Sequence, residues 1–219
     1  RSVSRGLGDV YKRQELGKEI GKTAAEFIND KFTADDKAQV TVIGYPSTKV
    51  LKERADGIKE GLKENCKDNY EVIAEVDGLE APEAQSNVES VLSAHPDANV
   101  FVGVGAGAMI GSNEALLQKY GKGKIPENVG VITTDVTEQQ LNSLKAGNEA
   151  VRSIVGFEGS NEDTAKACMK MYERILSGEK FEGDDHNVYR TIKPITTDNI
   201  DEILKGCLLY TSDAADDKA

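Results

Sequence analysis

The chain has 219 residues, and 38 Asp and Glu against 27 Lys and Arg give it a formal net charge of -11. A nucleic-acid-binding protein needs a surplus of Lys and Arg to neutralise phosphates, so this acidic balance argues against nucleic acid as a partner. The hydrophobic share of 38% is typical of a globular protein, and no apolar run approaches the roughly 20 residues of a membrane-spanning helix.

The two ends of the chain read as translated sequencing adapters. Residues 4–14 match the translation of a transposase end sequence and adapter arm used in fragment-library preparation, and residues 207–217 match the reverse complement of the other arm. We therefore predict that 1–14 and 207–219 are adapter-derived and non-native, and that 15–206 is the natural part. A gene cut at both ends would have lost any signal peptide or N-terminal DNA-binding module, so the missing signal sequence is uninformative.

Short apolar runs alternate with amphipathic helical stretches in the natural part, which is typical of a parallel sheet built from βα units. The expected elements are, in chain order, a helix at 15–32, a strand at 40–44, a helix at 49–65, a strand at 71–76, a helix at 84–94, a strand at 99–104, a helix at 109–120, a strand at 129–134, a helix at 137–146, a strand at 150–155, a helix at 161–176, an extended segment at 188–195 and a short helix at 199–204. These units predict an α/β fold, a doubly wound parallel sheet with helices on both faces in a three-layer αβα arrangement.

The ends of the predicted strands indicate where a ligand would bind, because open parallel sheets hold ligands in the crevice beyond the carboxyl ends of their strands. The residues at those ends are 45–48, 77–80, 105–108, 135–137 and 156–159. They are rich in glycine, carboxylates and hydroxyl groups and lack His and Cys, which argues against metal or nucleophilic chemistry. We therefore expect no cofactor and no metal.

Catalytic groups are scarce elsewhere in the sequence. His95 and His186 lie far apart and away from the expected crevice, and the aspartate pairs at 35–36 and 184–185 fit solvated turns better than acid/base pairs. Paired catalytic carboxylates require a spacing that the sequence does not establish. We expect no enzyme activity. The natural part has two cysteines that we expect to be free thiols, Cys66 and Cys168.

Several segments carry a resemblance to a known family through their order and spacing. They are LGKEIGKTAAEFI, VTVIGYPSTKVLKERADGIKEGLKEN, NVESVLSAHPDANVFVGVGAGAMIGSNEALLQKYG, VGVITTDVTEQQLNSLKAG, ILSGEKFE and TIKPITTDNIDEI. In this order they resemble the type I periplasmic binding proteins, the sugar-binding components of ABC transporters. The resemblance implies a two-lobed clamp, of which this chain contains mainly the C-terminal lobe, with most of the N-terminal lobe missing.

The resemblance also implies ligand-binding residues. Asp135 matches a carboxylate that accepts hydrogen bonds from sugar hydroxyls, which a charged acceptor makes stronger; alternatively, it caps the helix that starts near Thr137. Lys52 matches a position often occupied by a sugar-binding Arg, and Arg54 lies two residues on, although a solvated helix face explains both. Tyr45 directly follows a strand and could stack on a pyranose ring, or pack in the core or at the lip of the site.

The chain also departs from the family pattern. Gly105 and Ala106 stand where the family has Asn-Asp, whose Asn contacts sugar, so those side-chain hydrogen bonds are lost. Where a family Gln often contributes, Phe157 or Glu158 could substitute. The glycine-rich turn at 105–108 also offers backbone N–H groups to an anion, or room for a close approach, but no phosphate-loop motif is present, so nucleotide hydrolysis is not expected.

The resemblance predicts a non-enzymatic, monomeric receptor for a small polar solute, in the first place a sugar. It would lie in the periplasm or otherwise outside the cytoplasm, secreted or lipid-anchored, and its closed form would dock on the membrane permease of an ABC transporter. The alternative is the effector domain of a LacI-type repressor, which shares the fold and the pocket but carries an N-terminal helix-turn-helix. The ending TTDNIDEI and the acidic surface favour the receptor. A third possibility, an α/β enzyme, rests on the fold alone.

Overall fold

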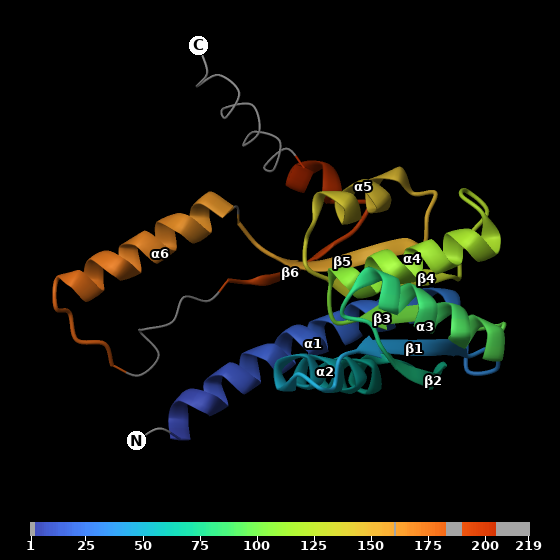
Figure 1. Ribbon diagram of the computed structural model, residues 1–219, viewed down its shortest axis with the longest axis horizontal. Coiled ribbons are helices and arrows are strands. Elements are labelled where there is room, and N and C mark those ends of the chain that lie inside the picture. Colours follow the sequence, from blue (N-terminus) through green and yellow to red (C-terminus); the bar gives the residue numbers. More distant parts are fainter. Residues whose placement is uncertain (1–2, 160, 183–189, 205–219) are drawn as a thin grey trace, which may run out of the picture. The chain divides into compact units, whose positions relative to one another are not determined.

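The computed structural model describes residues 3–159, 161–182 and 190–204 (Figure 1). The elements within these residues are, in chain order, α1 (Val3–Lys31), β1 (Ala38–Gly44), α2 (Lys49–Asn65), β2 (Tyr70–Asp77), α3 (Ala81–Ala94), β3 (Val100–Gly103), α4 (Ala106–Tyr120), β4 (Gly130–Thr134), α5 (Glu138–Ala146), β5 (Val151–Phe157), α6 (Asn161–Leu176) and β6 (Ile192–Ile195). A short helix at 200–204 follows. Among the described residues, no helix combines the length and apolar character needed to cross a bilayer.

The strands form one sheet in the order β2-β1-β3-β4-β5-β6. β1 pairs in parallel with β2 and with β3, and the pairs β3–β4 and β4–β5 are also parallel. The chain runs from β1 outward to β2 and then returns past β1 to β3, so the strand order reverses between β1 and β3. Such a reversal opens a crevice at the carboxyl ends of the two strands. The predicted doubly wound parallel sheet is confirmed.

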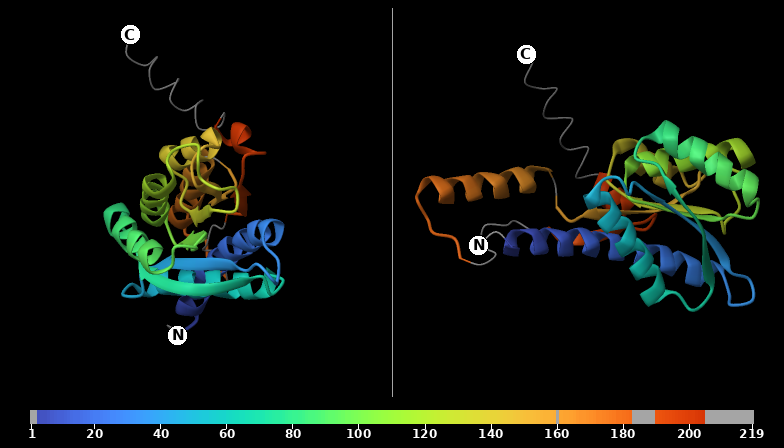
Figure 2. Two further views of the ribbon diagram at one scale, coloured as in Figure 1. Left: turned by 90° about the vertical axis from the view of Figure 1, so that its right-hand side faces the viewer. Right: turned by 60° about the horizontal axis from the view of Figure 1, so that its bottom comes forward.

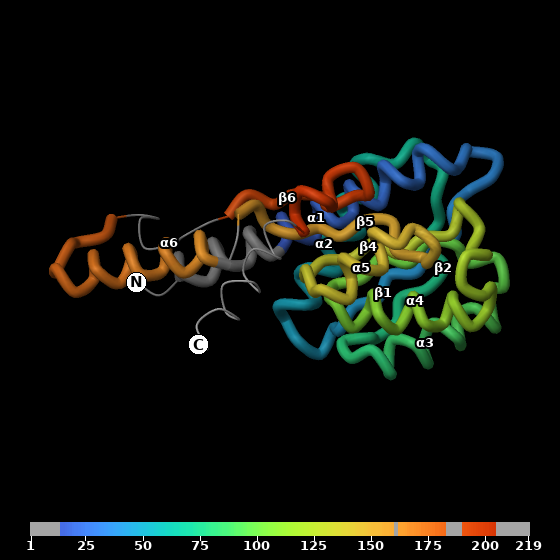
Figure 3. The backbone as a smooth tube through the Cα atoms, turned by 90° about the horizontal axis from the view of Figure 1, so that it is seen from above, coloured from blue at the N-terminus to red at the C-terminus, as the bar shows by residue number. Residues whose placement is uncertain are grey.

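Helices cover both faces of this sheet. α1 and α2 pack against each other on one face, and α3 and α4 pack against each other on the opposite face (Figure 3). The left view of Figure 2 shows the same division, with α3 and α4 in green on one side of the strands and α1 in blue on the other. The predicted three-layer arrangement is therefore confirmed.

The centre of the sheet is apolar and buried. Every residue of β3 and β4 is buried, and Phe101 and Ile132 are among the largest fully buried side chains of the described part. The nearly unbroken apolar run predicted for 99–104 is explained by this position, because a strand covered on both faces gains from apolar side chains in both directions. The middle strands thus provide a rigid platform for the loops at their ends.

α1 and α2 approach each other through two pairs of glycines. The Cα of Gly17 lies beside Gly57, and that of Gly61 lies beside Gly21. A Cβ atom at position 61 would lie 2.3 Å from the carbonyl oxygen of Lys18, far inside van der Waals contact. The helices can lie this close only because none of the four positions carries a side chain. Both helices carry the spacing G-x-x-x-G, at 17–21 and at 57–61, which was a usable signal in the sequence for this contact.

Most predicted boundaries agree with the structure to within three residues. α2 and α6 span the predicted residues, and α3 and α4 each begin three residues earlier than predicted. α1 begins at Val3 rather than at 15, so the helix continues through the stretch predicted to be adapter-derived. Its conformation carries no information about the origin of the DNA that encodes it. The final extended segment, predicted from 188, is β6, and residues 183–189 lie outside the described residues.

The chain divides into two compact units. The first contains Arg1–Gly156 and Pro194–Asp201, and the second contains Phe157–Lys193 and Glu202–Ala219. The first unit therefore holds helices α1 to α5 and the strands whose carboxyl ends were predicted to bind the ligand, except for the last residue of β5. The second unit holds α6.

A half-buried carboxylate joins α4 to the start of β5 in the first unit. Glu149 accepts hydrogen bonds from Asn113 Nδ2 at 2.9 Å and from Lys122 Nζ at 2.8 Å, and Asn113 Oδ1 accepts from the backbone N–H of Ala150 at 2.9 Å. Burial of Glu149 disfavours its charged form, but the hydrogen bonds, from Lys122 above all, outweigh burial and lower its pKa below 4.5. The ionised form of Glu149 therefore stabilises the fold.

Replacing Glu149 by Gln should lower the free energy of unfolding by about 1.5 to 3 kcal/mol at pH 7, the range for hydrogen bonds to charged groups. Because the folded-state pKa is lowered, this stabilisation is present above the unfolded-state pKa and is lost as the pH falls through the folded-state value. Urea denaturation at a series of pH values should show wild type and Glu149→Gln converging once the pH has fallen below the lowered folded-state pKa of Glu149. The exposed Glu71→Gln is the control, and equal stability of all three proteins at pH 7 would contradict the assignment.

Candidate functional site

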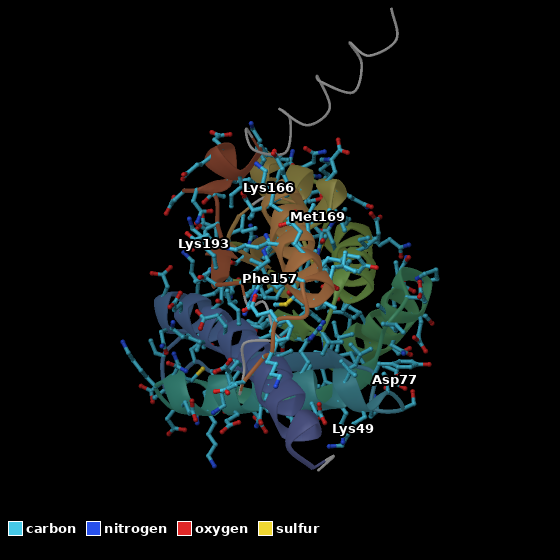
Figure 4. All side chains as sticks on the ribbon, turned by 90° about the vertical axis from the view of Figure 1, so that its left-hand side faces the viewer. Lys49, Asp77, Phe157, Lys166, Met169 and Lys193 are labelled. Atoms are coloured by element: carbon cyan, nitrogen blue, oxygen red, sulfur yellow. The ribbon has the colours of Figure 1, made fainter. Side chains whose placement is uncertain are left out.

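The loops that follow β1, β3 and β4 lie at one edge of the sheet, because these three strands are adjacent and parallel. Val104, just after β3, donates its backbone N–H to the carbonyl oxygen of Ile43 in β1 at 3.1 Å. Ala106, at the start of α4, donates its N–H to Asp135 Oδ2 at 3.3 Å. The structure thus brings together three residues predicted for the site, Gly105, Ala106 and Asp135. Figure 4 looks onto this edge and labels Asp77 at the end of β2 and Lys49 at the start of α2.

Asp135 has an unusual backbone conformation at the end of β4. Its φ of 65° is in the left-handed region, which residues other than glycine seldom adopt and which Asp and Asn tolerate best. The side chain is exposed. The alternative prediction, that Asp135 caps α5, is wrong: the N-cap is Thr137, whose side chain accepts the backbone N–H of Gln140 in a capping box. Asp135 is therefore not needed to cap the helix, and its carboxylate faces the loop after β3.

Gly105 and Ala106 contribute space and a backbone donor instead of side chains. A Cβ atom at Gly105 would lie 3.0 Å from Asp135 Oδ2, so the absence of a side chain lets the carboxylate reach the N–H of Ala106. The glycine-rich turn was predicted to offer backbone N–H groups to an anion. In the structure the N–H of Ala106, the first residue of α4, already donates to the Asp135 carboxylate. A negative charge is favourable at this position, because the N-terminus of a helix carries a partial positive charge. Gly105, which stands where the resemblance would place an Asn, therefore lies at a direct contact between the loop after β3 and the loop after β4.

Gln140 supports the end of β4 and was not identified from the sequence. This fully buried side chain donates from Nε2 to the carbonyl oxygen of Thr134 at 3.1 Å, and its Oε1 accepts the backbone N–H of Thr137 at 2.9 Å. It therefore fixes the backbone on both sides of Asp135. The T-x-x-Q spacing at 137–140 is the signature of a capping box and was a usable signal.

Replacing Gln140 by Met would keep the volume but leave the Thr134 carbonyl and the Thr137 N–H without this partner. Because an unsatisfied buried polar group costs about 1 to 3 kcal/mol, we expect the free energy of unfolding to fall by about 2 kcal/mol or more. Urea denaturation monitored by circular dichroism measures the change. Gln139→Met on the exposed face of the same helix is the matched control. A loss no greater than that of this control would contradict a supporting role for Gln140.

Arg54 anchors the end of β3 from α2. Its Nη1 donates to the carbonyl oxygen of Val104 at 2.6 Å, one residue before Gly105. The sequence suggested a ligand contact or a solvated helix face for Arg54. The structure shows it in a partly buried position rather than on a solvated face, holding the loop that carries Gly105 and Ala106, and a ligand contact by Arg54 stays a prediction. Only the folded arrangement reveals this contact, because the two residues lie 50 positions apart.

Lys52 lies on a charged face of α2 and points toward β2. Its Nζ pairs with Asp56 at 2.6 Å, and Asp56 pairs in turn with Lys59, which reaches Glu75 in β2. The Lys52 bond, ahead of the Lys59 bond, lowers the pKa of Asp56. A shallow pocket here is lined by Val42, Gly44, Pro46, Lys52, Ala55, Asp56, Lys59, Glu75, Val76 and Asp77. The exposed Lys52 side chain agrees with the alternative of a solvated helix face, and ligand binding by Lys52 stays a prediction.

Tyr45 follows β1 directly and is half-buried. Its carbonyl oxygen accepts the N–H of Thr48 at 3.1 Å, which closes the turn into α2. Tyr45 therefore lies at the same edge of the sheet as Gly105 and Asp135, at the end of the neighbouring strand. Stacking on a sugar ring stays a prediction.

Phe157 and Glu158 belong to the second unit, which is described by itself. Phe157 is 45% exposed, and the Arg190 guanidinium lies 5.8 Å from the centre of its ring. Glu158 donates its backbone N–H to the Thr191 carbonyl oxygen at 2.8 Å, and its own carbonyl oxygen accepts from Arg190 Nε at 3.0 Å. These contacts tie residues 157–159 to 190–191 within the unit. A role of either side chain in ligand binding stays a prediction.

The described residues that were considered for catalysis lie away from this edge. His95 caps the C-terminus of α3, before β3 begins, and therefore lies toward the opposite edge of the sheet. The Asp35–Asp36 pair is in an exposed bend, while His186 and the pair at 184–185 lie outside the described residues. Cys66 and Cys168 are free thiols. Within the described part of the chain, no cluster of three or more His, Cys, Asp or Glu side chains could hold a metal ion.

A family model described as periplasmic binding protein domain matches residues 11–180, which is most of the chain. The chain belongs to this family. The curated relative ABC transporter periplasmic-binding protein YphF of Escherichia coli (strain K12) is 27% identical over 169 residues, which is 76% of this chain. The chain spans only 49% of that relative's length.

Two solved structures that share the fold are described as sugar-binding or solute-binding proteins. GanP, a glucose-galactose binding protein from Geobacillus stearothermophilus, matches with a TM-score of 0.68 at 20% identity, over 85% of this chain and 61% of its own. A periplasmic solute binding protein from Actinobacillus succinogenes 130z with bound D-allose matches with a TM-score of 0.71 at 15% identity, over 87% of this chain and 62% of its own. The family and the fold are those of binding proteins.

Proposed function

We propose that the chain is a ligand-binding lobe of a receptor that binds a small polar solute, in the first place a sugar, for an ABC transporter. The observation that carries this proposal is Asp135, an exposed carboxylate at the carboxyl end of β4 and beside the loop after β3. A carboxylate accepts hydrogen bonds from sugar hydroxyls, and a charged acceptor strengthens them. Two of the related proteins, the glucose-galactose binding protein and the solute binding protein solved with D-allose, support the same class of ligand.

The remaining parts of the proposal concern the whole parent protein. The name of the Escherichia coli relative supports a place outside the cytoplasm, in the periplasm or as a secreted or lipid-anchored protein, with a membrane permease as partner. The receptor would act as a monomer, without enzyme activity or a cofactor. Residues 1–14 and 207–219 would be adapter-derived, and residues 15–206 would belong to a longer parent with a further lobe.

Recovering the parent gene from its source DNA tests these statements together. The proposal predicts that the parent departs from this chain at 1–14 and 207–219, and that a secretion signal and a further lobe precede residue 15. A helix-turn-helix in place of the secretion signal would contradict the receptor and favour a repressor. Native codons continuing through both end segments would contradict their adapter origin.

Calorimetric titration of the complete protein tests the ligand class. D-Glucose, D-galactose, D-ribose, D-arabinose and D-allose form the panel, and leucine serves as a solute of similar size without hydroxyl groups. We expect saturable binding of at least one sugar with one site per chain and no binding of leucine. Binding of leucine with no response to any sugar would contradict the proposal.

A further inference from the structure

Three carboxylates at the carboxyl edge of the sheet lack a cationic partner. Asp77 ends β2, Glu80 lies just before α3, and Asp135 follows β4. Among the described residues, none of the three forms an ion pair with another. Glu80 and Asp135 are exposed and Asp77 is half-buried. Their negative charges therefore act on the solution in front of this edge.

The loop after β2 carries the first two of these carboxylates and is anchored on both sides. The backbone N–H of Gly78 donates to the carbonyl oxygen of Gly44 in β1 at 3.0 Å. On the other side, a Cβ atom at Gly107 in α4 would lie far inside van der Waals contact with the carbonyl oxygen of Leu79. The first turn of α4 also binds Asp135. All three carboxylates are thus held around the end of β1 and the start of α4.

The lysines of this edge are paired with carboxylates of their own helix. The Nζ of Lys49 lies 3.8 Å from Glu53 Oε1, and the Nζ of Lys52 lies 2.6 Å from Asp56 Oδ2. Figure 4 labels Lys49 at the start of α2 and Asp77 at the end of β2. Each lysine pair has no net charge, so the two lysines leave the charge of the three carboxylates uncompensated.

The helix N-termini at this edge are also used within the protein. Such termini carry a partial positive charge and are common sites for anionic ligands. The N-terminus of α4 binds Asp135, Glu83 in the first turn of α3 accepts the N–H of Leu79 at 3.3 Å, and α5 has its capping box. α2 lacks a side-chain cap, and its first turn begins with Lys49. An anion accepted at this edge would therefore bind at the start of α2.

We propose that this edge selects the sugar by charge: it accepts neutral sugars and sugars with an ammonium group, and it disfavours sugars with a carboxylate or a phosphate. Asp77 and Glu80 determine this selectivity together with Asp135. Walls of one charge sign raise the local concentration of ligands of the opposite sign and lower that of ligands of the same sign. The inference rests on the proposed function, because it narrows the class of sugar that the proposed site takes.

Two charged thiol reagents measure the electrostatic potential of this edge without a ligand. Ser47 is exposed in the loop after β1, and β1 lies between β2 and β3, so Ser47→Cys places a thiol among these loops. The background is Cys168→Ser/Cys207→Ser, in which Cys66 reacts slowly because burial raises the pKa of its thiol to about 11. Peptide mass spectrometry of the 219-residue chain gives the rates for cationic trimethylammonium-ethyl and anionic sulfonatoethyl methanethiosulfonate.

The ratio of the cationic rate to the anionic rate should fall at least about threefold in Asp77→Asn/Glu80→Gln, because both charges lie on the neighbouring loop. Glu71→Gln, near the start of β2 and so at the opposite edge, is the control and should leave the ratio unchanged. The fall should disappear in 1 M salt, where the Debye length is about 3 Å. An unchanged ratio in the double variant would overturn the inference. So would an unmutated edge with a ratio below that of free N-acetylcysteine, since the start of α2 would then make the edge positive.

A pair of sugars that differ mainly in charge tests the selectivity in the complete protein. D-Glucuronamide has nearly the shape of D-glucuronate but no charge. In calorimetric titration we expect D-glucuronate to bind at least about tenfold more weakly than D-glucuronamide, and this difference should shrink in Asp77→Asn/Glu80→Gln. Binding of D-glucuronate as tight as that of D-glucuronamide, or tighter, would overturn the inference. A complete lack of sugar binding would contradict the proposed function instead, and it would not alter the ratio of thiol rates.

Discussion

Replacing Asp135 by Asn should weaken sugar binding by the complete protein by about 10- to 100-fold, because a hydrogen bond to a charged group contributes about 1.5 to 3 kcal/mol. Asn is the informative substitution, since it has the same shape and tolerates the left-handed backbone that Asp135 adopts at φ 65°. Calorimetric titration with the best-bound sugar of the panel measures the effect, and the melting temperature should change little.

The matched control is Glu138→Gln, which removes an exposed carboxylate three residues away in the first turn of α5. Its affinity for the sugar should equal that of the wild type. Asp135→Ala should bind as weakly as Asp135→Asn but should also be less stable, because Ala tolerates the left-handed region poorly. Wild-type affinity in Asp135→Asn would show that the carboxylate does not contact the ligand.

Replacing Gly61 by Ala should destabilise the protein by about 1 to 3 kcal/mol, the usual cost of inserting a methyl group into packed space. The added Cβ would lie 2.3 Å from the carbonyl oxygen of Lys18, so α1 and α2 would have to move apart. The direction of the change is the test, because replacing Gly by Ala in an ordinary helix raises the stability of the protein by roughly 0.5 to 1 kcal/mol. Urea denaturation of the 219-residue chain measures the difference.

Gly61→Leu should have a larger effect and should prevent stable packing of α1 on α2. Lys63→Ala, on the exposed side of α2 two residues away, is the control and should leave the free energy of unfolding nearly unchanged. An increase in stability for Gly61→Ala would contradict the close approach of the two helices. The expected loss would show that the contact between α1 and α2 is an essential part of the fold.

The layers of the fold could be predicted because they depend on local patterns. Strand 99–104 was recognisable as a nearly unbroken apolar run, and such runs are typical of strands whose two faces are both covered. The stretch 49–65 shows helical periodicity and coincides with α2. The edge of the sheet that holds Asp135 followed from the rule that parallel strands end on the same side.

The contacts within the site could not be predicted, because they join residues far apart in sequence. The bond from Ala106 to Asp135 spans 29 positions, and the bond from Arg54 to Val104 spans 50. The way in which α2 lies on the sheet decides which of its charged residues contact the loop after β3 and which face solvent. The helical periodicity of the sequence does not determine this placement. The capping box of Thr137 with Gln140 is different, since both residues lie within one helical turn and the motif was readable.

Three contacts at the carboxyl edge explain why this edge can present a fixed acceptor to a ligand. Arg54 holds the end of β3, Gln140 holds the end of β4, and the N–H of Ala106 holds one oxygen of Asp135. A binding residue that is fixed before the ligand arrives loses less conformational entropy on binding. The exposed carboxylate is therefore supported by partners that need not touch the ligand.

The most direct test of Asp135 as the sugar acceptor is a crystal structure of the complete protein grown with the best-bound sugar of the panel. The sugar should lie beyond the carboxyl ends of β1, β3 and β4, with at least one hydroxyl oxygen within about 3 Å of the Asp135 carboxylate. A sugar bound at another surface, with Asp135 contacting only Ala106, would contradict the proposed site.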